Sequence, residues 1–302
     1  MHATEAFSRF DQDLARQSKS ALTRHGYGAD LRDYAHWVQA TYGEAFEPGG
    51  ITADDVRQYR AHLLTVRHAK PATINRRLAA LSMFCRWGVQ HGLLRDDPTA
   101  DIPAAQQARS APKALNRSDL NRLLRKVKQS GNPLHIAVIL TLANTGLRVG
   151  ELVALETSDV DIKERSGIVR VRLGKGSRYR EVPLNAESRQ ALRAYLEVRP
   201  QPAGGVAALF ISQRGEALTS SGVWRMLSKY AQQAGVDHVS PHVLRHSFAS
   251  LLLREQQVDL VTVADLLGHQ SVNTTMRYTR STEANRQAAV EQFEAGVVAQ
   301  HE

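Results

Sequence analysis

The feature that most constrains the fold is a break in the hydrophobic pattern between Asp96 and Lys113. Over this stretch, D-D-P-T-A-D-I-P-A-A-Q-Q-A-R-S-A-P-K, prolines and small residues replace any apolar period. Such a composition is typical of an extended interdomain linker. The chain has 302 residues, which is enough for two domains with separate cores. We therefore expect a first domain over residues 1–102, a linker over 103–112 and a second domain over 113–302.

The first segment predicts an all-helical domain, because its apolar residues recur at near-helical intervals. Thr52, with Asp55 three residues later, resembles a capping box, and Pro71 suits the first position of a further helix. The expected helices cover about residues 4–17, 19–42, 53–68 and 71 onward. Three arginines on the polar side of the last helix could follow a phosphate backbone or simply form a solvated face: Arg76, Arg77 and Arg86.

The second segment predicts helices and one β-hairpin, so the expected fold is mainly α with a small antiparallel β-sheet. Residues 168–173 alternate apolar and polar side chains, a glycine-rich turn follows, and residues 178–184 return. Lys175 then lies at the tip of the hairpin. Gly146 is expected to end a helix. The expected helices are 118–128, 133–144, 147–154, 187–198, 221–233, 241–254, 258–267 and 283–298.

One helix start combines two side chains suited to an anion. Ser240 is a favourable N-cap and Pro241 a favourable first helical residue. His242 and Arg245, three residues apart, then share one face near the positive end of the helix dipole, which favours a ligand such as a phosphate. From this stretch alone, two polar residues on a solvated face explain the pattern equally well.

The charge balance points to a polyanionic partner. Lys and Arg number 39 against 30 Asp and Glu, which gives a net charge of +9, and most of the excess follows Ser110. A basic surface suits nucleic acid, although solubility alone can explain a net charge of this size.

Metal, membrane and disulfide chemistry are not expected. The single cysteine, Cys85, excludes an internal disulfide and a cysteine-based zinc site. His242 and His246 have the spacing of a helical zinc pair, but Val243 stands where a metalloprotease needs Glu. We therefore expect no metal and no cofactor. No signal peptide or bilayer-spanning run is recognisable, so a cytoplasmic location is expected.

Five motifs occur in an order and spacing that resemble the catalytic domain of the tyrosine recombinases, which include phage integrases and Xer recombinases. They are T-G-L-R-V-G-E-L (145–152), G-K-G-S-R-Y-R-E-V-P-L (174–184), H-V-L-R-H-S-F-A (242–249), L-L-G-H (266–269) and T-T-M-R-Y-T (274–279). The resemblance covers residues 113–285 closely. Residues 72–84 also resemble the helical, SAM-like core-binding domain of this family, whose two domains form a C-shaped clamp on DNA.

The resemblance implies the site and the reaction. It assigns Tyr278 as nucleophile, Arg148 and Arg245 as phosphate-clamping arginines, Lys175, His242 and His269 as further catalytic residues, and Glu151 as a supporting residue. A phenol with an ordinary pKa of about 10 is a weak nucleophile near neutral pH, so a positive field must assist it. The implied product is a 3'-phosphotyrosyl link. Strands are then exchanged through a Holliday junction without metal or ATP.

Two alternatives remain at this level, a type IB-like topoisomerase and a sequence-specific DNA-binding protein that does not cleave. Plasmid relaxation without strand exchange would identify the first, and binding without cleavage would identify the second. Because no additional N-terminal domain is recognisable, the resemblance is closest to short Xer-type or mobile-element recombinases, which act in chromosome dimer resolution, integration or transposition.

The expected partner is double-stranded DNA with an inverted-repeat core site, bound in the nucleoid. Besides the first domain, Arg225 and Lys229 are candidates for DNA contacts. The apolar strip of residues 283–298 either docks on its own domain or, as the family resemblance implies, inserts into a neighbouring protomer. We favour the second reading, which gives a homo-tetramer or a hetero-tetramer with a paralogue.

Overall fold

The computed structural model describes residues 1–106, 114–172 and 179–268. Contacts divide the chain into two units, Met1–Arg109 and Ser110–Glu302. The helices of the first unit are α1 (Ala3–Arg16), α2 (Ala21–Tyr42), the 3-10 turn η1 (Pro48–Gly50), α3 (Ala53–Thr65) and α4 (Pro71–Gln90).

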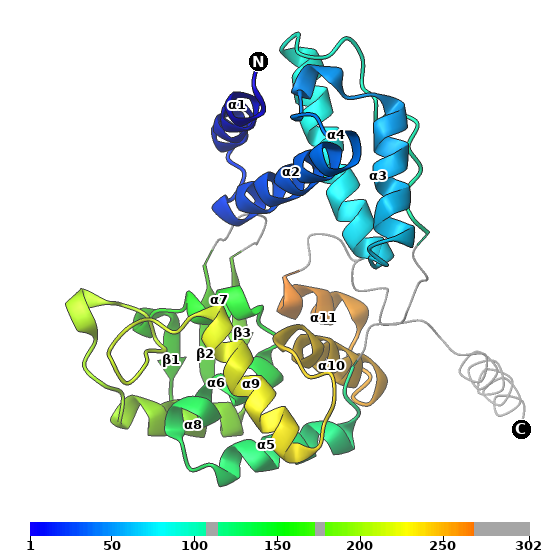
Figure 1. The fold of residues 1–302 in the computed structure, drawn as a ribbon. Helices are drawn as coiled ribbons and strands as arrows, with labels where there is room; N and C mark the ends of the chain where they lie inside the picture. The colour runs from blue at the N-terminus through cyan, green and yellow to red at the C-terminus, as the bar shows by residue number, and fades with distance from the viewer. Residues whose placement is uncertain (107–113, 173–178, 269–302) are drawn as a thin grey trace, which may run out of the picture. The chain divides into compact units, whose positions relative to one another are not determined.

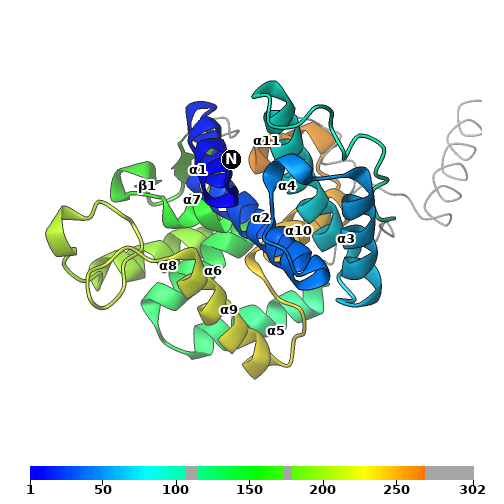
Figure 2. The same cartoon turned by 45° about the horizontal axis from the view of Figure 1, so that its top comes forward.

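In the first unit, α2 packs against both α1 and α4, and α3 packs against α4 (Figure 1, Figure 2). The core is rich in aromatic rings, with Phe84 in edge contact with Phe10, and Tyr34 in edge contact with Tyr59. The capping box predicted at the start of α3 is present, since Thr52 and Asp55 each accept a hydrogen bond from the backbone N–H of the other.

The core of the first unit includes Ala105, which lies inside the segment predicted as a linker. Ala105 is buried against the aromatic core. The side-chain amide of Asn75 on α4 donates to the carbonyl oxygen of Ala105 at 3.0 Å and accepts from its N–H at 2.7 Å. These two hydrogen bonds attach the segment at Ala105 to α4.

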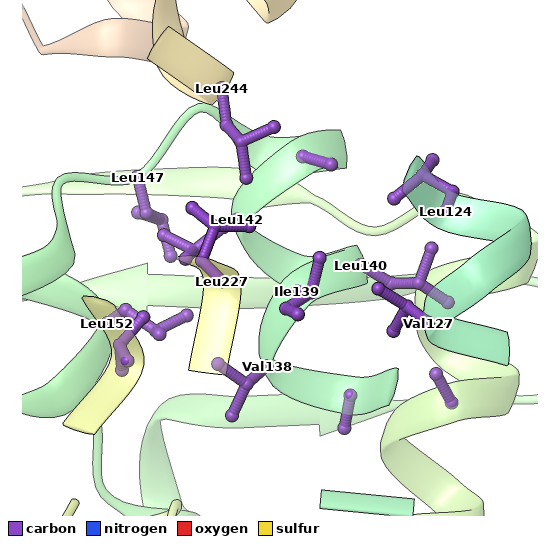
Figure 3. Packing of buried hydrophobic residues seen from close by; sticks show 14 of the residues in the cluster. Leu124, Val127, Val138, Ile139, Leu140, Leu142, Leu147, Leu152, Leu227 and Leu244 are labelled. Carbon is purple, nitrogen blue, oxygen red and sulfur yellow. The ribbon is translucent and has the colours of Figure 1, made fainter. Parts of the chain in front are cut away.

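The second unit surrounds a buried helix. Its elements are α5 (Arg117–Gln129), α6 (Pro133–Thr145), α7 (Val149–Val153), η2 (Thr157–Asp159), β1 (Val160–Ile162), β2 (Gly167–Val171), β3 (Arg180–Pro183), α8 (Ala186–Glu197), η3 (Ala203–Gly205), α9 (Ser220–Ala234), α10 (Pro241–Arg254) and α11 (Leu260–Leu267). α6 is apolar on all sides and contacts α5, α7, α8, α9 and α10. Figure 3 shows Ile139, Leu140 and Leu142 of α6 within this core, with Leu124 and Val127 of α5 to one side.

The sheet has the order β1-β2-β3 with antiparallel pairing. The register places Val169 opposite both Val160 and Val182, so one face of the sheet is continuous with the core. The predicted hairpin of β2 and β3 and the mainly helical fold with a small antiparallel sheet are confirmed. β1 was not predicted, because three residues are too few to show an alternating pattern.

Several helix boundaries differ from those predicted from the sequence, and the largest difference is at the end of α3, which ends at Thr65 rather than at about residue 68. α7 begins after Arg148 rather than at residue 147, because Arg148 has an extended backbone (φ −69°, ψ 147°) and serves as the N-cap. α11 begins at Leu260 because the carboxylate of Asp259 accepts the N–H of Thr262 at 2.9 Å as an N-cap. The helix predicted over residues 283–298 lies outside the described residues.

Across residues 1–106, 114–172 and 179–268, no helix is long and apolar enough to cross a membrane.

Candidate active site

Arg148 is fixed in both its backbone and its side chain by one carboxylate. Gly146 ends α6 in the left-handed conformation (φ 63°), and the chain turns through Leu147 to Arg148. The N–H of Arg148 donates to Oε2 of Glu151 at 2.8 Å, and its Nη1 donates to Oε1 at 2.8 Å. The side chain of Arg148 is 42% exposed. The guanidinium group is therefore held in place while still open to a ligand.

Arg180 on β3 holds the same carboxylate from the buried side. Its Nη2 donates to Oε2 of Glu151 at 2.8 Å and its Nη1 donates to Oε1 at 3.1 Å. Its Nε donates to the carbonyl oxygen of Leu266 at 2.9 Å. Arg180 was not predicted from the sequence as a residue of this site. The signal was available, because in a strand Arg180 shares a face with Val182, whose side chain is buried.

This environment keeps Glu151 ionised. Burial alone would raise the pKa of Glu151. The hydrogen bonds from the Arg180 side chain and the Arg148 backbone, together with the nearby guanidinium charges, outweigh burial and lower the pKa to about 2.

Arg245 on α10 is buried, with 3% of its surface exposed. The start of α10 is as predicted, since the Ser240 hydroxyl accepts the N–H of Val243 at 3.1 Å and Pro241 occupies the first turn. The Nη1 of Arg245 donates to the carbonyl oxygen of Gly146 at 2.7 Å, and its Nη2 donates to that of Leu267 at 2.7 Å. Arg245 thus ties α10 to the turn before Arg148 and to the end of α11.

These contacts join four charged side chains, which we call the arginine network: Arg148, Glu151, Arg180 and Arg245. Arg180 and Arg245 bond to the carbonyl oxygens of consecutive residues at the end of α11, and Arg245 also bonds to the turn that leads to Arg148. The network holds three guanidinium groups and one carboxylate, which Arg148 and Arg180 contact, so its net charge is positive. Such a cluster suits a phosphate diester, whose oxygens accept the planar donor pairs of arginine.

His242 lies exposed in the first turn of α10, one helical turn before Arg245. Its ring contacts that of His246 edge to face, with centroids 4.2 Å apart. Among the described residues, no group of three or more His, Cys, Asp or Glu side chains could hold a metal ion. Three predicted site residues, Lys175, His269 and Tyr278, lie outside the described residues, and their roles stay predictions.

The three arginines predicted to follow a phosphate backbone in the first unit all contact carboxylates. Arg77 is 17% exposed and donates to Asp33 at 2.7 Å, which makes it part of the packing between α4 and α2. Arg76 pairs with Asp30, and Arg86 with Asp97 at 3.3 Å, but both remain more than half exposed. Arg76 and Arg86 can therefore still contact a ligand, whereas Arg77 is largely enclosed.

In the second unit, α9 carries an exposed polar surface. Arg225 and Lys229, one turn apart, are both exposed and line a groove of ≈ 780 Å³ together with Arg214. Trp224, which directly precedes Arg225, is 48% exposed and was not singled out from the sequence. Burial, with Lys229 nearby, lowers the pKa of His135, another residue of this groove.

Comparisons with known proteins agree on both units. The family model described as "Phage integrase family" matches residues 113–285, and "Phage integrase, N-terminal SAM-like domain" matches residues 7–93. Tyrosine recombinase XerC of Neisseria gonorrhoeae is 37% identical over 282 residues, covering 91% of this chain and 90% of the relative. Tyrosine recombinase XerD of Ralstonia nicotianae is 36% identical, covering 92% and 90%.

The fold is also similar to that of a recombinase whose structure was solved in complex with DNA. The structure of XerH site-specific recombinase bound to palindromic difH substrate superposes with a TM-score of 0.74 at 22% identity, covering 92% of this chain and 82% of that one.

Proposed function

This chain belongs to the phage integrase family and is a site-specific tyrosine recombinase, and from that premise we propose that Arg148 and Arg245 clamp the phosphate that Tyr278 attacks. The observation that supports this assignment is the arginine network. In this network the carboxylate of Glu151 holds the guanidinium group of Arg148. The backbone carbonyl oxygens of Gly146 and Leu267 hold that of Arg245. The long similarity to XerC and XerD favours a recombinase over the topoisomerase and the non-cleaving protein.

The proposed reaction is a transesterification. The phenol oxygen of Tyr278 forms a bond to phosphorus, the phenol proton passes to a base, and the bond from phosphorus to the 5' oxygen breaks. Lys175 protonates the departing 5' oxygen, so the products are a 3'-phosphotyrosyl link and a free 5' hydroxyl. Attack by the 5' hydroxyl of another strand reverses the step, which allows strand exchange through a Holliday junction without ATP.

The described residues have distinct parts in this reaction. Arg148 and Arg245 neutralise the non-bridging oxygens, whose charge grows in the transition state, and each such preorganised contact contributes about 3 to 4 kcal/mol. His242, near the positive end of α10, exchanges a proton at the phosphate or at the tyrosine. Glu151 supports Arg148. We further propose that His269 donates a hydrogen bond to a phosphate oxygen.

A trapping experiment tests this assignment. A nicked suicide substrate that carries the chain's own recombination site is incubated with the protein in EDTA, and covalent adducts are separated by denaturing electrophoresis. The wild-type protein should form an adduct and Tyr278→Phe should form none. Tyr179→Phe, which removes an exposed phenol that donates to Glu181, is the matched control and should react normally. An adduct with Tyr278→Phe would show that another residue is the nucleophile.

We also propose the partners. The solved XerH complex contains its DNA substrate, and by analogy double-stranded DNA with an inverted-repeat core site is the partner here, bound in the cytoplasm at the nucleoid. Exposed Arg225 and Lys229 on α9 contact the duplex, and Arg76 and Arg86 contact it from the first unit. The domains are proposed to be residues 1–102 and 113–302, joined by 103–112, and both are proposed to contact DNA.

The proposed assembly on DNA is a tetramer of this chain, or of this chain and a paralogue, joined by residues 283–298 in trans. Light scattering of the protein on paired sites measures the number of protomers. Removal of residues 283–302 should leave the complex on a single site but abolish the tetramer.

A further inference from the structure

Arg180 is a buried cation at the centre of the candidate active site that the sequence motifs did not assign. Its side chain is 7% exposed, against 42% for Arg148. Its Nε donates to Leu266 and both of its Nη atoms donate to Glu151, so its known contacts are all within the protein. An effect of Arg180 on the reaction is therefore expected to pass through these groups.

Arg180 is held from three sides. Strand β3 fixes its backbone through the pairing of Arg180 with Val171 on β2. Its Nε donates to the carbonyl oxygen of Leu266 at 2.9 Å. Gly268 lies directly against the guanidinium group, since a Cβ placed on Gly268 would be 2.8 Å from Nη1 of Arg180. The guanidinium group has little freedom to reorient.

The remaining donors of Arg180 grip Glu151 with two parallel bonds of 2.8 Å and 3.1 Å, the geometry in which arginine binds a carboxylate most strongly. The same two oxygens accept from Arg148, one from its N–H and one from its Nη1. Glu151 therefore lies between a buried and an exposed guanidinium group, and its single negative charge is shared between them.

This sharing determines how much positive charge Arg148 presents. With Arg180 in place, the three side chains carry a net charge of +1, and the exposed one is Arg148. Without Arg180, the carboxylate would have Arg148 as its remaining guanidinium partner and would cancel its charge. Attraction at such short distances is strong where water is excluded.

We propose that Arg180 is a positioning residue of the recombinase: it neutralises and orients Glu151, so that Arg148 keeps its charge and its direction for the DNA phosphate. This role rests on the proposed function of Arg148. It predicts that Arg180 acts on the cleavage step while DNA binding, which many other phosphate contacts support, changes little.

The first measurement separates cleavage from binding. Arg180→Met, similar in length but uncharged, should cleave the bound suicide substrate about 10- to 100-fold more slowly than wild type, as expected when a phosphate-binding group is displaced. Its affinity for the same site, measured by fluorescence anisotropy, should stay within about threefold. Arg170→Met on the neighbouring strand removes an arginine that pairs with surface carboxylates, and it should leave both quantities unchanged.

The second measurement is a double-mutant cycle with Glu151→Gln. If Arg180 works by offsetting the charge of Glu151, removing that charge should make Arg180 largely dispensable. The double variant Arg180→Met, Glu151→Gln should then cleave faster than Arg180→Met alone and within about threefold of Glu151→Gln alone. A role of Arg180 that does not pass through Glu151 predicts additive losses, so that the double variant would cleave more slowly than either single variant. The double variant also leaves no unpaired buried charge. It should therefore fold even if Arg180→Met, which leaves Glu151 without its buried partner, does not.

The outcomes distinguish the positioning role from the proposed function. A wild-type protein that forms no adduct overturns both. If wild type forms an adduct, the positioning role alone is wrong when Arg180→Met cleaves at the wild-type rate, or when the double variant is no faster than Arg180→Met. Should Arg180→Met fail to fold, Arg180→Lys replaces it in the same cycle. Equal losses from Arg180→Lys with and without Glu151→Gln would then overturn the role.

Discussion

At the scale of single residues, one carboxylate determines where charge is available in the candidate site. Glu151 is almost enclosed, yet it remains ionised because the guanidinium groups on either side compensate for its burial. A buried ion pair is not by itself a sign of high stability, since desolvation offsets much of the attraction. Its value here is orientation, because the carboxylate bonds to both the backbone and the side chain of Arg148.

The low pKa of Glu151 predicts how its contribution to stability depends on pH. A carboxylate with a folded pKa of about 2, below the ordinary 4.5, stabilises the folded state above pH 4.5 and loses this effect as pH falls through 2. The linkage corresponds to about 3 kcal/mol. Urea unfolding of wild type and Glu151→Gln should therefore differ most near neutral pH and converge towards pH 2.

The control for this prediction is Glu164→Gln, an exposed position between β1 and β2. Its unfolding free energy should follow that of wild type throughout the range. A gap between wild type and Glu151→Gln that stays constant down to pH 2 would contradict the assigned pKa.

At the scale of secondary structure, the ends of helices rather than their middles build the site. α6 ends at Gly146, α7 begins after Arg148, and α11 ends at Gly268. Gly146 is needed for two reasons, its positive φ of 63° and the close approach of Phe248, whose Cδ1 would lie 2.5 Å from a Cβ. Its carbonyl oxygen also accepts from Arg245.

Gly146→Ala should therefore destabilise the second unit by about 2 to 3 kcal/mol, because backbone strain and overpacking add. Gly235→Ala is the matched control. Gly235 also ends a helix with a positive φ, 60°, but a Cβ there would meet no atom within 4 Å. It should cost only the strain, about 1 to 2 kcal/mol. Thermal unfolding of both variants measures the difference, and equal losses would show that the packing against Phe248 is unimportant.

The sequence predicted the helices, the hairpin and the helix start at Ser240, because each depends on a local pattern. It did not predict β1, which is too short to show a period, or the role of Arg180, which depends on contacts with Glu151 and Leu266 far away in the chain. Nor did it show that Arg77 would be enclosed by a carboxylate of another helix. Local sequence patterns do not predict which polar side chains pair across long distances in the chain.

At the scale of the whole molecule, the chain has two separate hydrophobic cores and a net charge of +9, and the proposed partner is a polyanion. Binding to DNA should weaken steeply with salt, because each neutralised phosphate releases counterions. Lys229→Gln, on the exposed face of α9, should weaken binding and lower the slope of log affinity against log salt by about one. Lys163→Gln, which removes an exposed lysine near Asp161, is the control and should leave the slope unchanged. Equal slopes for wild type and Lys229→Gln would show that Lys229 on α9 does not contact a DNA phosphate.

The end of α11 has one further consequence. Two buried cations complement the negative pole of this short helix, so its last turn is anchored against fraying. The backbone at Gly268 is therefore held in place beside Arg180 and Arg245, the second of which is proposed to bind the DNA phosphate.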